Sequence, residues 1–218
     1  MEKATKTIIW FGMMILYLLL NVFGARTIKI LNIQNNLILN LATLGIELLI
    51  TLIFILFYIK DFQKDLPEIR KNDKEYLGNS LRIWLLGLII MILSNSVISY
   101  IVGGIAENEE LNRQILNTSY IYAIPSMVIM APIVEEILFR LSLGKIFNNK
   151  YIFAIISGLV FGYMHVIGSH GLEYLYIIPY GALGASFGYL YKKYNNIYCS
   201  IFAHMIHNLL CVIIITLI

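Results

Sequence analysis

The chain has 218 residues, of which 59% are hydrophobic and only 13% are charged. Soluble globular domains carry about 25% charged residues, and a mean hydropathy of +0.78 also excludes an ordinary soluble protein. The small net charge of +3 gives no reason to expect nucleic acid as a partner. We therefore expect one membrane domain over residues 1–218, with the lipid bilayer as its solvent.

Apolar runs of roughly 20 residues divide the chain into seven candidate spans. The pattern predicts an all-α membrane protein, a polytopic helical bundle of about seven transmembrane helices. The first run is longer than the apolar core of a signal peptide, so we expect it to be retained. The polar stretch 60–82 is predicted to hold a helix on the membrane surface. The predicted spans are 7–24, 37–59, 83–105, 119–141, 151–167, 174–191 and 197–218.

Basic residues lie mainly on one side of these spans. Of the 16 Lys and Arg residues, 12 fall in the N-terminal segment and in the loops after spans two, four and six, and three fall on the opposite side. The positive-inside rule then places the N-terminus in the cytoplasm, for a multi-pass protein of the plasma membrane. The Ile-, Asn- and Lys-rich composition suggests an AT-rich bacterial genome.

The fourth predicted span contains three charged residues, Glu135, Glu136 and Arg140. Each charge within a span costs about 2.5–3.5 kcal/mol on insertion scales, so such residues pair with each other or have a function. Glu136 and Arg140 have the i,i+4 spacing of a helical ion pair, with the acid first. Glu135 is left without a cation on its own helix, and we expect it to face a polar cavity.

Three histidines also fall within predicted spans. His165 ends the fifth span, while His204 and Asn208 share one face of the last span at i,i+4. A lone intramembrane histidine is more often a hydrogen-bonded core residue than a catalyst, and we interpret His207 in that way. Two spans with histidine that follow a span with two acids favour a chemical function.

Peptide hydrolysis within a membrane needs a base to activate water and donors for the oxyanion. A glutamate or a histidine can take the proton from water. An imidazole and a side-chain amide can donate hydrogen bonds to the oxyanion, where the loss of one donor costs about 10²–10³ in rate. Glu135, His165, His204 and Asn208 together provide these groups.

Three motifs in order, Glu135-Glu136-xxx-Arg140, Phe161-xxx-His165 and His204-xxx-Asn208, resemble the signatures of the CAAX protease and bacteriocin-processing family. This family is also called Abi or type II CAAX endopeptidase-like. The resemblance covers residues 120–218. It implies a membrane peptidase with a polar cavity open to the cytosol, in which Glu135 and His165 activate water and His204 and Asn208 stabilise the oxyanion. Glu136 and Arg140 would be a supporting pair.

Zinc is the alternative to metal-free glutamate catalysis, since two histidines and a glutamate can bind it. The chain has no HExxH motif and the three candidate ligands lie on separate spans, so we expect no metal and no other cofactor. Glu47, in the second span, is interpreted as structural, although it could line the cavity or pair with Arg140.

Two other functional classes remain open. A proton-coupled transporter also uses intramembrane Glu, Arg and His residues, but the sequence shows no inverted repeat. A catalytically idle relative could act as a membrane scaffold or as a bacteriocin immunity protein. The sequence does not identify the peptide or protein substrate or the oligomeric state. Glycine pairs in the fifth and sixth spans predict close helix contacts. These pairs are Gly158 with Gly162, and Gly184 with Gly188.

Overall fold

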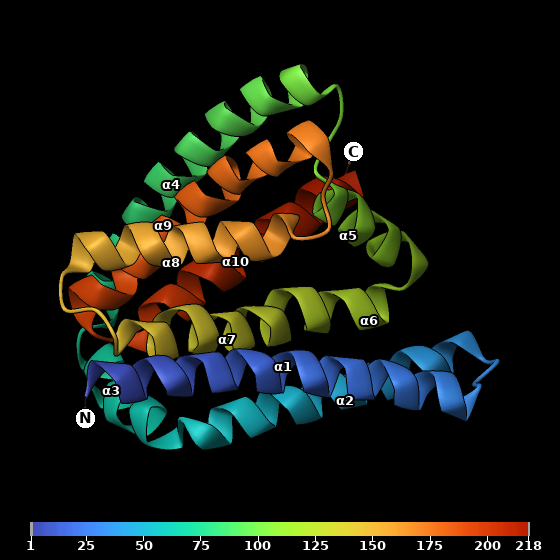
Figure 1. The fold of residues 1–218 in the computed structure, drawn as a ribbon, viewed down its shortest axis with the longest axis horizontal. Coiled ribbons are helices and arrows are strands. Elements are labelled where there is room, and N and C mark those ends of the chain that lie inside the picture. Colours follow the sequence, from blue (N-terminus) through green and yellow to red (C-terminus); the bar gives the residue numbers. More distant parts are fainter. Residues whose placement is uncertain (1, 218) are drawn as a thin grey trace.

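The computed structural model describes residues 2–217, and all regular elements in this part of the chain are helices (Figure 1). The predicted all-α membrane fold is therefore confirmed. Five helical stretches are long and apolar enough to cross a membrane. These are α1 (Lys3–Leu31), α2 (Asn36–Phe57), α4 (Asp73–Val102), the continuous stretch Tyr120–Ser142 and α10 (Ile197–Leu217).

Two further helices lie where the fifth and sixth spans were predicted. α8 (Lys150–Val166) is apolar but has only 17 residues, and α9 (Ile177–Tyr194) is not among the five span-forming helices. The count of seven spans therefore stays a prediction. α9 packs between α4 and α8, where protein contacts can replace contacts with lipid, whereas α8 has an outer face with exposed Ile155 and Leu159.

The stretch Tyr120–Ser142 is not a uniform α-helix. It consists of α6 (Tyr120–Ile124), the π-helical segment η1 (Pro125–Met130), α7 (Ala131–Glu136) and the π-helical segment η2 (Ile137–Ser142). π-Helical turns are rare and occur frequently at functional sites. Here η2 begins directly after Glu136 and contains Arg140, so the charged residues of this span lie at a change of helical geometry.

Two surface helices complete the fold with one short 3-10 helix, η3 (Gly171–Tyr176). α3 (Ile59–Lys71) occupies the polar stretch for which a surface helix was predicted, and it turns Phe62 and Ile69 into the protein. α5 (Glu107–Thr118) was not predicted, because the region between the third and fourth spans was interpreted as a loop.

The segments predicted to be cytoplasmic gather at one end of the bundle, the end where Figure 1 shows the N-terminus and α3. Lys145, after η2, forms an ion pair with Asp61 of α3 at 3.0 Å. Lys192, at the end of α9, donates a hydrogen bond to the carbonyl of Gly144 at 2.6 Å. This arrangement agrees with the predicted alternation of the loops across the membrane.

The glycine pairs lie where α8 and α9 approach most closely. A Cβ atom on Gly162 would lie 2.6 Å from the carbonyl oxygen of Ile177, and one on Gly158 would lie 2.5 Å from that of Gly181. Only glycine permits these backbone approaches. The predicted close helix contacts are confirmed, and they position His165 of α8 beside α9.

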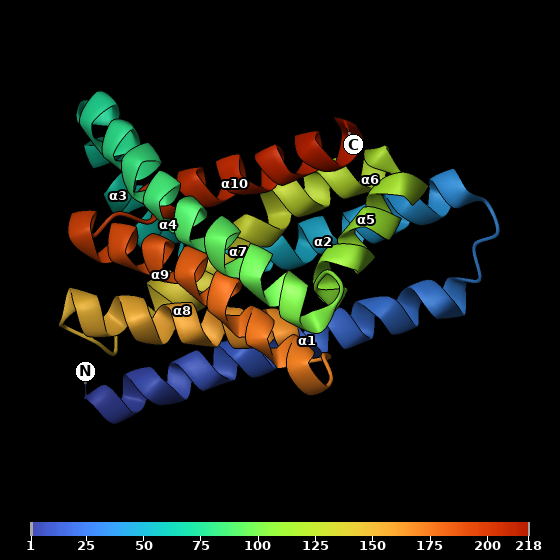
Figure 2. The same ribbon diagram turned by 90° about the horizontal axis from the view of Figure 1, so that it is seen from above.

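α7, which carries Glu135 and Glu136, lies among other helices of the bundle. Seen from above, α10 runs along one side of α7 and α1 along the other (Figure 2). Trp10 of α1 donates a hydrogen bond through Nε1 to the carbonyl of Leu138 at 3.1 Å. The N-terminal helix is thereby attached to η2, directly beside the charged residues.

Candidate active site

Glu136 and Arg140 form the predicted ion pair, with Nε of Arg140 3.2 Å from Oε2 of Glu136 and both side chains fully buried. The guanidinium also donates to the carbonyl of Gly184 at 3.0 Å. Its Cζ atom lies 4.8 Å from the ring centre of Phe161 and 5.5 Å from that of Phe187. Ring faces attract cations, so this environment partly offsets the cost of burying Arg140.

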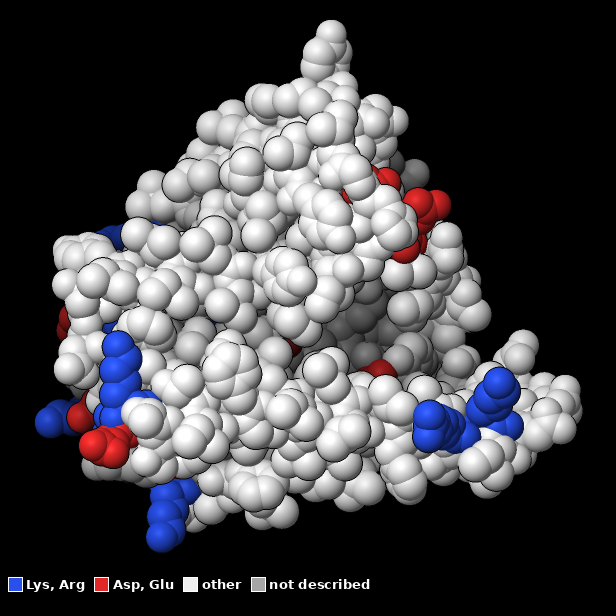
Figure 3. All heavy atoms as spheres, viewed as in Figure 1, with Lys and Arg blue, Asp and Glu red and all other residues white. Residues whose placement is uncertain are grey.

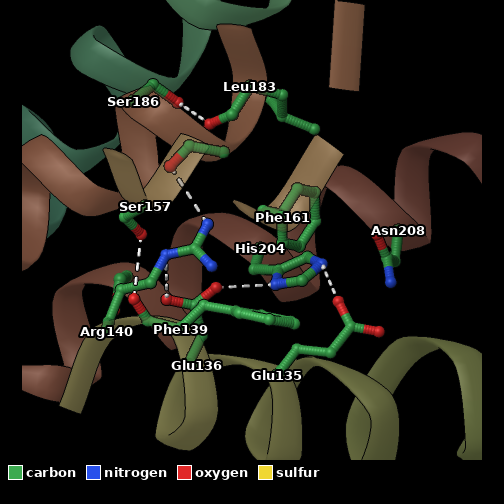
Figure 4. A network of polar contacts seen from close by, with 12 residues as sticks. Glu135, Glu136, Phe139, Arg140, Ser157, Phe161, Leu183, Ser186, His204 and Asn208 are labelled. Atoms are coloured by element: carbon green, nitrogen blue, oxygen red, sulfur yellow. Dashed lines mark hydrogen bonds and ion pairs between the residues drawn. The ribbon is translucent and has the colours of Figure 1, made fainter. Parts of the chain in front are cut away.

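His204 lies between the two glutamates (Figure 4). Its Nδ1 atom is 2.9 Å from Oε1 of Glu136, and its Nε2 atom is 3.7 Å from Oε2 of Glu135. An ionised carboxylate only accepts hydrogen bonds, so Nδ1 carries the proton in the contact with Glu136. The longer distance to Glu135 exceeds a normal hydrogen bond, which leaves Nε2 uncommitted.

Glu135 is the more exposed of the two acids. Its side chain is 21% exposed, whereas that of Glu136 is 0% exposed. Its Oε2 atom accepts no hydrogen bond from the described residues. Oε2 itself is buried, so the 21% exposure of this side chain comes from its other atoms, and the polar cavity beside Glu135 stays a prediction.

The imidazole of His165 lies between two aromatic rings. Its centre is 4.2 Å from that of Phe161 and 4.7 Å from that of Tyr180, which stacks on it at 28°. Nδ1 lies 2.8 Å from the carbonyl oxygen of Phe161. Because a carbonyl oxygen can only accept, Nδ1 carries a proton, and a ring with that single proton has Nε2 as its acceptor.

Asn208 lies one turn after His204 on α10, and its Nδ2 atom donates to the carbonyl of Met127 in η1 at 2.7 Å. A primary amide has two N–H groups, so one remains for another acceptor. His207 is buried, with Nε2 3.5 Å from the sulfur of Cys211 and no partner for Nδ1 among the described residues. This burial agrees with its interpretation as a core residue.

Glu47 was considered as a partner for Arg140, and the structure gives it a different one. The hydroxyl of Tyr122 in α6 donates to Oε1 of Glu47. Arg140 instead pairs with Glu136, its neighbour on the same helix. An ion pair between Glu47 and Arg140 is therefore the wrong alternative, because the nearer acid already occupies the guanidinium.

The face of the molecule seen in Figure 3 is hollowed between the upper helices and α1, and acidic atoms are visible within the hollow. Figure 4 shows that Glu135, His204 and Asn208 lie close together although they come from two helices. Among residues 2–217, no group of three or more His, Cys, Asp and Glu side chains is arranged to hold a metal ion. The prediction of metal-free catalysis remains a prediction.

Sequence reasoning identified Phe161 through its motif but not two other aromatic residues around the site. Phe187 stacks on His204 with ring centres 4.7 Å apart, and Tyr180 stacks on His165. Both come from α9, where no motif distinguishes them from other apolar residues of a span. Only the distance to the histidines reveals them.

The fold and the site together define a polytopic helical membrane protein with a glutamate–histidine centre among its helices. Residues 117–210, which include all four candidate catalytic residues, match the family described as type II CAAX prenyl endopeptidase Rce1-like. The chain is 30% identical over 178 residues to the protein named "Putative membrane peptidase YdiL" of Bacillus subtilis (strain 168), covering 77% of this chain and 69% of that protein. The chain belongs to this family of CAAX-type membrane proteases.

Two proteins of Lactococcus lactis subsp. lactis (strain IL1403) are also similar. The chain is 31% identical over 150 residues to UPF0177 protein YbdI, covering 60% of this chain and 75% of that protein. It is 27% identical over 153 residues to UPF0177 protein YxdF, covering 62% of this chain and 81% of that protein. No solved structure matches the chain.

Proposed function

We propose that the chain is an intramembrane endopeptidase of the plasma membrane, with its N-terminus in the cytoplasm. Its substrates are membrane-associated, lipidated or leader-bearing peptides. The observation that carries the proposal is the partly exposed Glu135 facing Nε2 of His204 across 3.7 Å. These two side chains place a base and a candidate donor side by side, where water and a peptide carbonyl can bind against them.

In the first step, Glu135 and His165 activate water. Glu135 takes a proton from a water molecule whose oxygen bonds to the peptide carbonyl carbon, and the C=O π electrons move to the carbonyl oxygen. Nε2 of His165 is the acceptor that orients the same water. The orientation of the His165 imidazole is fixed because its Nδ1–H donates to the carbonyl oxygen of Phe161.

The negative oxygen of the tetrahedral intermediate needs donors. Nε2 of His204 is one when the ring carries a proton on each nitrogen, with Nδ1–H held by Glu136. The second N–H of the Asn208 amide is the other, since the first is bonded to Met127. Donors fixed in this way need little reorganisation when charge develops.

In the second step, the intermediate collapses and the C–N bond breaks. Glu135 gives its proton to the leaving nitrogen, and the carboxylate is regenerated. The products are a carboxylic acid and an amine. Glu136 and Arg140 do not touch the substrate, and they support the site by holding His204.

The test compares the wild-type chain with Glu135→Gln in liposomes that contain a digest of bacterial membrane proteins. Mass spectrometry records the new peptide ends. We expect Glu135→Gln to lower cleavage by at least about 100-fold, because a general base contributes about 10²–10⁴ in rate. Glu110→Gln, which changes an exposed acid of α5, is the matched control. Equal cleavage by Glu135→Gln and the wild type rejects this mechanism.

A chelator decides the question of zinc. We expect EDTA or phenanthroline to leave cleavage unchanged within about twofold, because the proposed steps use side chains alone. Loss of cleavage that added zinc restores would contradict the metal-free mechanism and favour zinc-bound water.

A further inference from the structure

Glu47 is an acid in the middle of a predicted span, and the proposed mechanism does not use it. It lies eleven residues after the start of α2 at Asn36 and ten before its end at Phe57. Its described partner is the hydroxyl of Tyr122, which donates to Oε1. No ion pair joins Glu47 to a cation among residues 2–217.

Acidic side chains outnumber basic ones in the middle of the spans. Three acids, Glu47, Glu135 and Glu136, lie there with one basic side chain, Arg140. Arg140 is committed to Glu136. A carboxylate surrounded by protein and lipid is strongly stabilised by a cation, because water does not screen the attraction. The group most complementary to Glu47 is therefore a cation supplied by a ligand.

Glu47 lies on the same side of the bundle as the candidate active site. α2 packs against α7, which carries Glu135, and against α6, which carries Tyr122. The two acids therefore lie on helices that pack against each other.

The helical stretch limits how far apart the two acids lie along its axis. Tyr122, which holds Glu47, is 13 residues before Glu135 on the stretch Tyr120–Ser142, a rise of at most roughly 20 Å at the 1.5 Å per residue of an α-helix, since the π-helical segment η1 between them is wound more widely. An extended peptide covers roughly 20 Å in about six residues at 3.3 Å each. A peptide with its scissile bond at Glu135 can therefore bring a nearby residue to Glu47.

We propose that Glu47, oriented by Tyr122, determines specificity by binding a cationic group of the peptide substrate. The group is a Lys or Arg side chain, or an N-terminal ammonium, within about six residues of the cleaved bond. This inference rests on the proposed peptidase function, because it assigns a position on the peptide. Tyr122 leaves Oε2 of Glu47 free to accept from the cation.

The first experiment measures cleavage. A bond cut by the wild type in the membrane-protein digest is placed in synthetic peptides that carry Lys or Gln at one position within six residues of it. At the best position, we expect kcat/KM to be about tenfold higher for Lys than for Gln. Glu47→Gln should reduce this ratio to about one, whereas Glu110→Gln should retain it.

A second experiment needs no cleavage and so remains informative if the proposed peptidase function fails. The full chain in an uncharged detergent is titrated with dodecylammonium or with neutral dodecanol, and its Tm is followed. We expect dodecylammonium to raise the Tm of the wild type and of Glu110→Gln more than dodecanol does. This difference should disappear in Glu47→Gln.

Each result decides the proposal. Equal Lys-to-Gln ratios in the wild type and Glu47→Gln, or equal Tm shifts in these two proteins, would overturn it. If either of these results is obtained while Glu135→Gln still abolishes cleavage, the proposed peptidase function is retained and only the role of Glu47 in specificity is rejected. If Glu47→Gln does not accumulate, Glu47→Met, neutral and of similar size, takes its place in both experiments.

Discussion

Nδ1 of His204 lies 2.9 Å from Oε1 of Glu136, although these residues are 68 positions apart in the chain. Glu136 also holds Arg140, so one buried carboxylate binds an imidazole and a guanidinium. Buried charges of this kind persist only when each is paired. The ion pair of Glu136 with Arg140 is therefore connected, through Glu136, to His204 of the candidate active site.

Removing only one member of the Glu136–Arg140 ion pair should destabilise the folded protein. Replacing Arg140 with Met leaves Glu136 buried with only His204 as a partner, and we expect a loss of about 3–5 kcal/mol in the free energy of unfolding. The double variant Glu136→Gln/Arg140→Met removes both charges and should recover part of this loss. Reversible unfolding in detergent measures both values. A double variant less stable than Arg140→Met would contradict the argument.

Tyr180 stacks on His165 and should matter for the reaction more than for folding. We expect Tyr180→Ala to lower kcat roughly tenfold, because His165 then loses one of the two rings that hold it as the acceptor for the attacking water. The pH profile of kcat should change with it. Tyr163→Ala is the matched control, since Tyr163 lies on the same helix as His165 and is exposed. Equal effects of the two variants would assign Tyr180 a structural role only.

Gly162 tests the close approach of α8 and α9. Alanine there would place Cβ 2.6 Å from the carbonyl oxygen of Ile177 and 2.9 Å from the amide nitrogen of Gly181, and backbone atoms cannot move aside cheaply. We expect Gly162→Ala to lower the free energy of unfolding by about 1–3 kcal/mol. Gly45→Ala, with nothing within 4 Å, should be neutral or stabilising by about 0.5–1 kcal/mol. Thermal unfolding in detergent compares the two.

Asp65 of α3 joins the surface helix to the start of α10. Its Oδ2 atom accepts from the amide of Ile197 at 2.9 Å, and its carbonyl accepts from Nδ2 of Asn196 at 2.8 Å. Burial raises the pKa of the Asp65 carboxyl from its usual value of 3.8, although the hydrogen bond from Ile197 acts in the opposite direction. The folded state therefore holds this proton more tightly than the unfolded state does.

The sign of the resulting pH dependence follows from linkage. The contribution of Asp65 to stability is complete below its usual pKa of 3.8 and is lost as pH rises through the higher pKa of the folded state. Asp65→Asn is neutral throughout and can still accept from Ile197. We expect its Tm, relative to the wild type, to rise as pH increases through this window. A constant difference between the two proteins would contradict the raised pKa.

The sequence alone determined the membrane class of the protein, the approximate positions of its helices and the ion pair of Glu136 with Arg140. Composition determines whether a chain is stable in a lipid bilayer, and the helical period brings residues four positions apart into contact. Both are local properties. The three motifs also indicated the family, since their order along the chain can be read from the sequence without knowing how the helices pack.

Only the tertiary structure decided how the helices rotate against one another. It brought His204 to both glutamates, placed Tyr180 on His165 and gave Glu47 to Tyr122 rather than to Arg140. These contacts depend on which face each span turns inward, and a mostly apolar helix gives little periodic signal for that choice. α5 escaped prediction for a related reason, because its polar sequence resembles a loop between two spans.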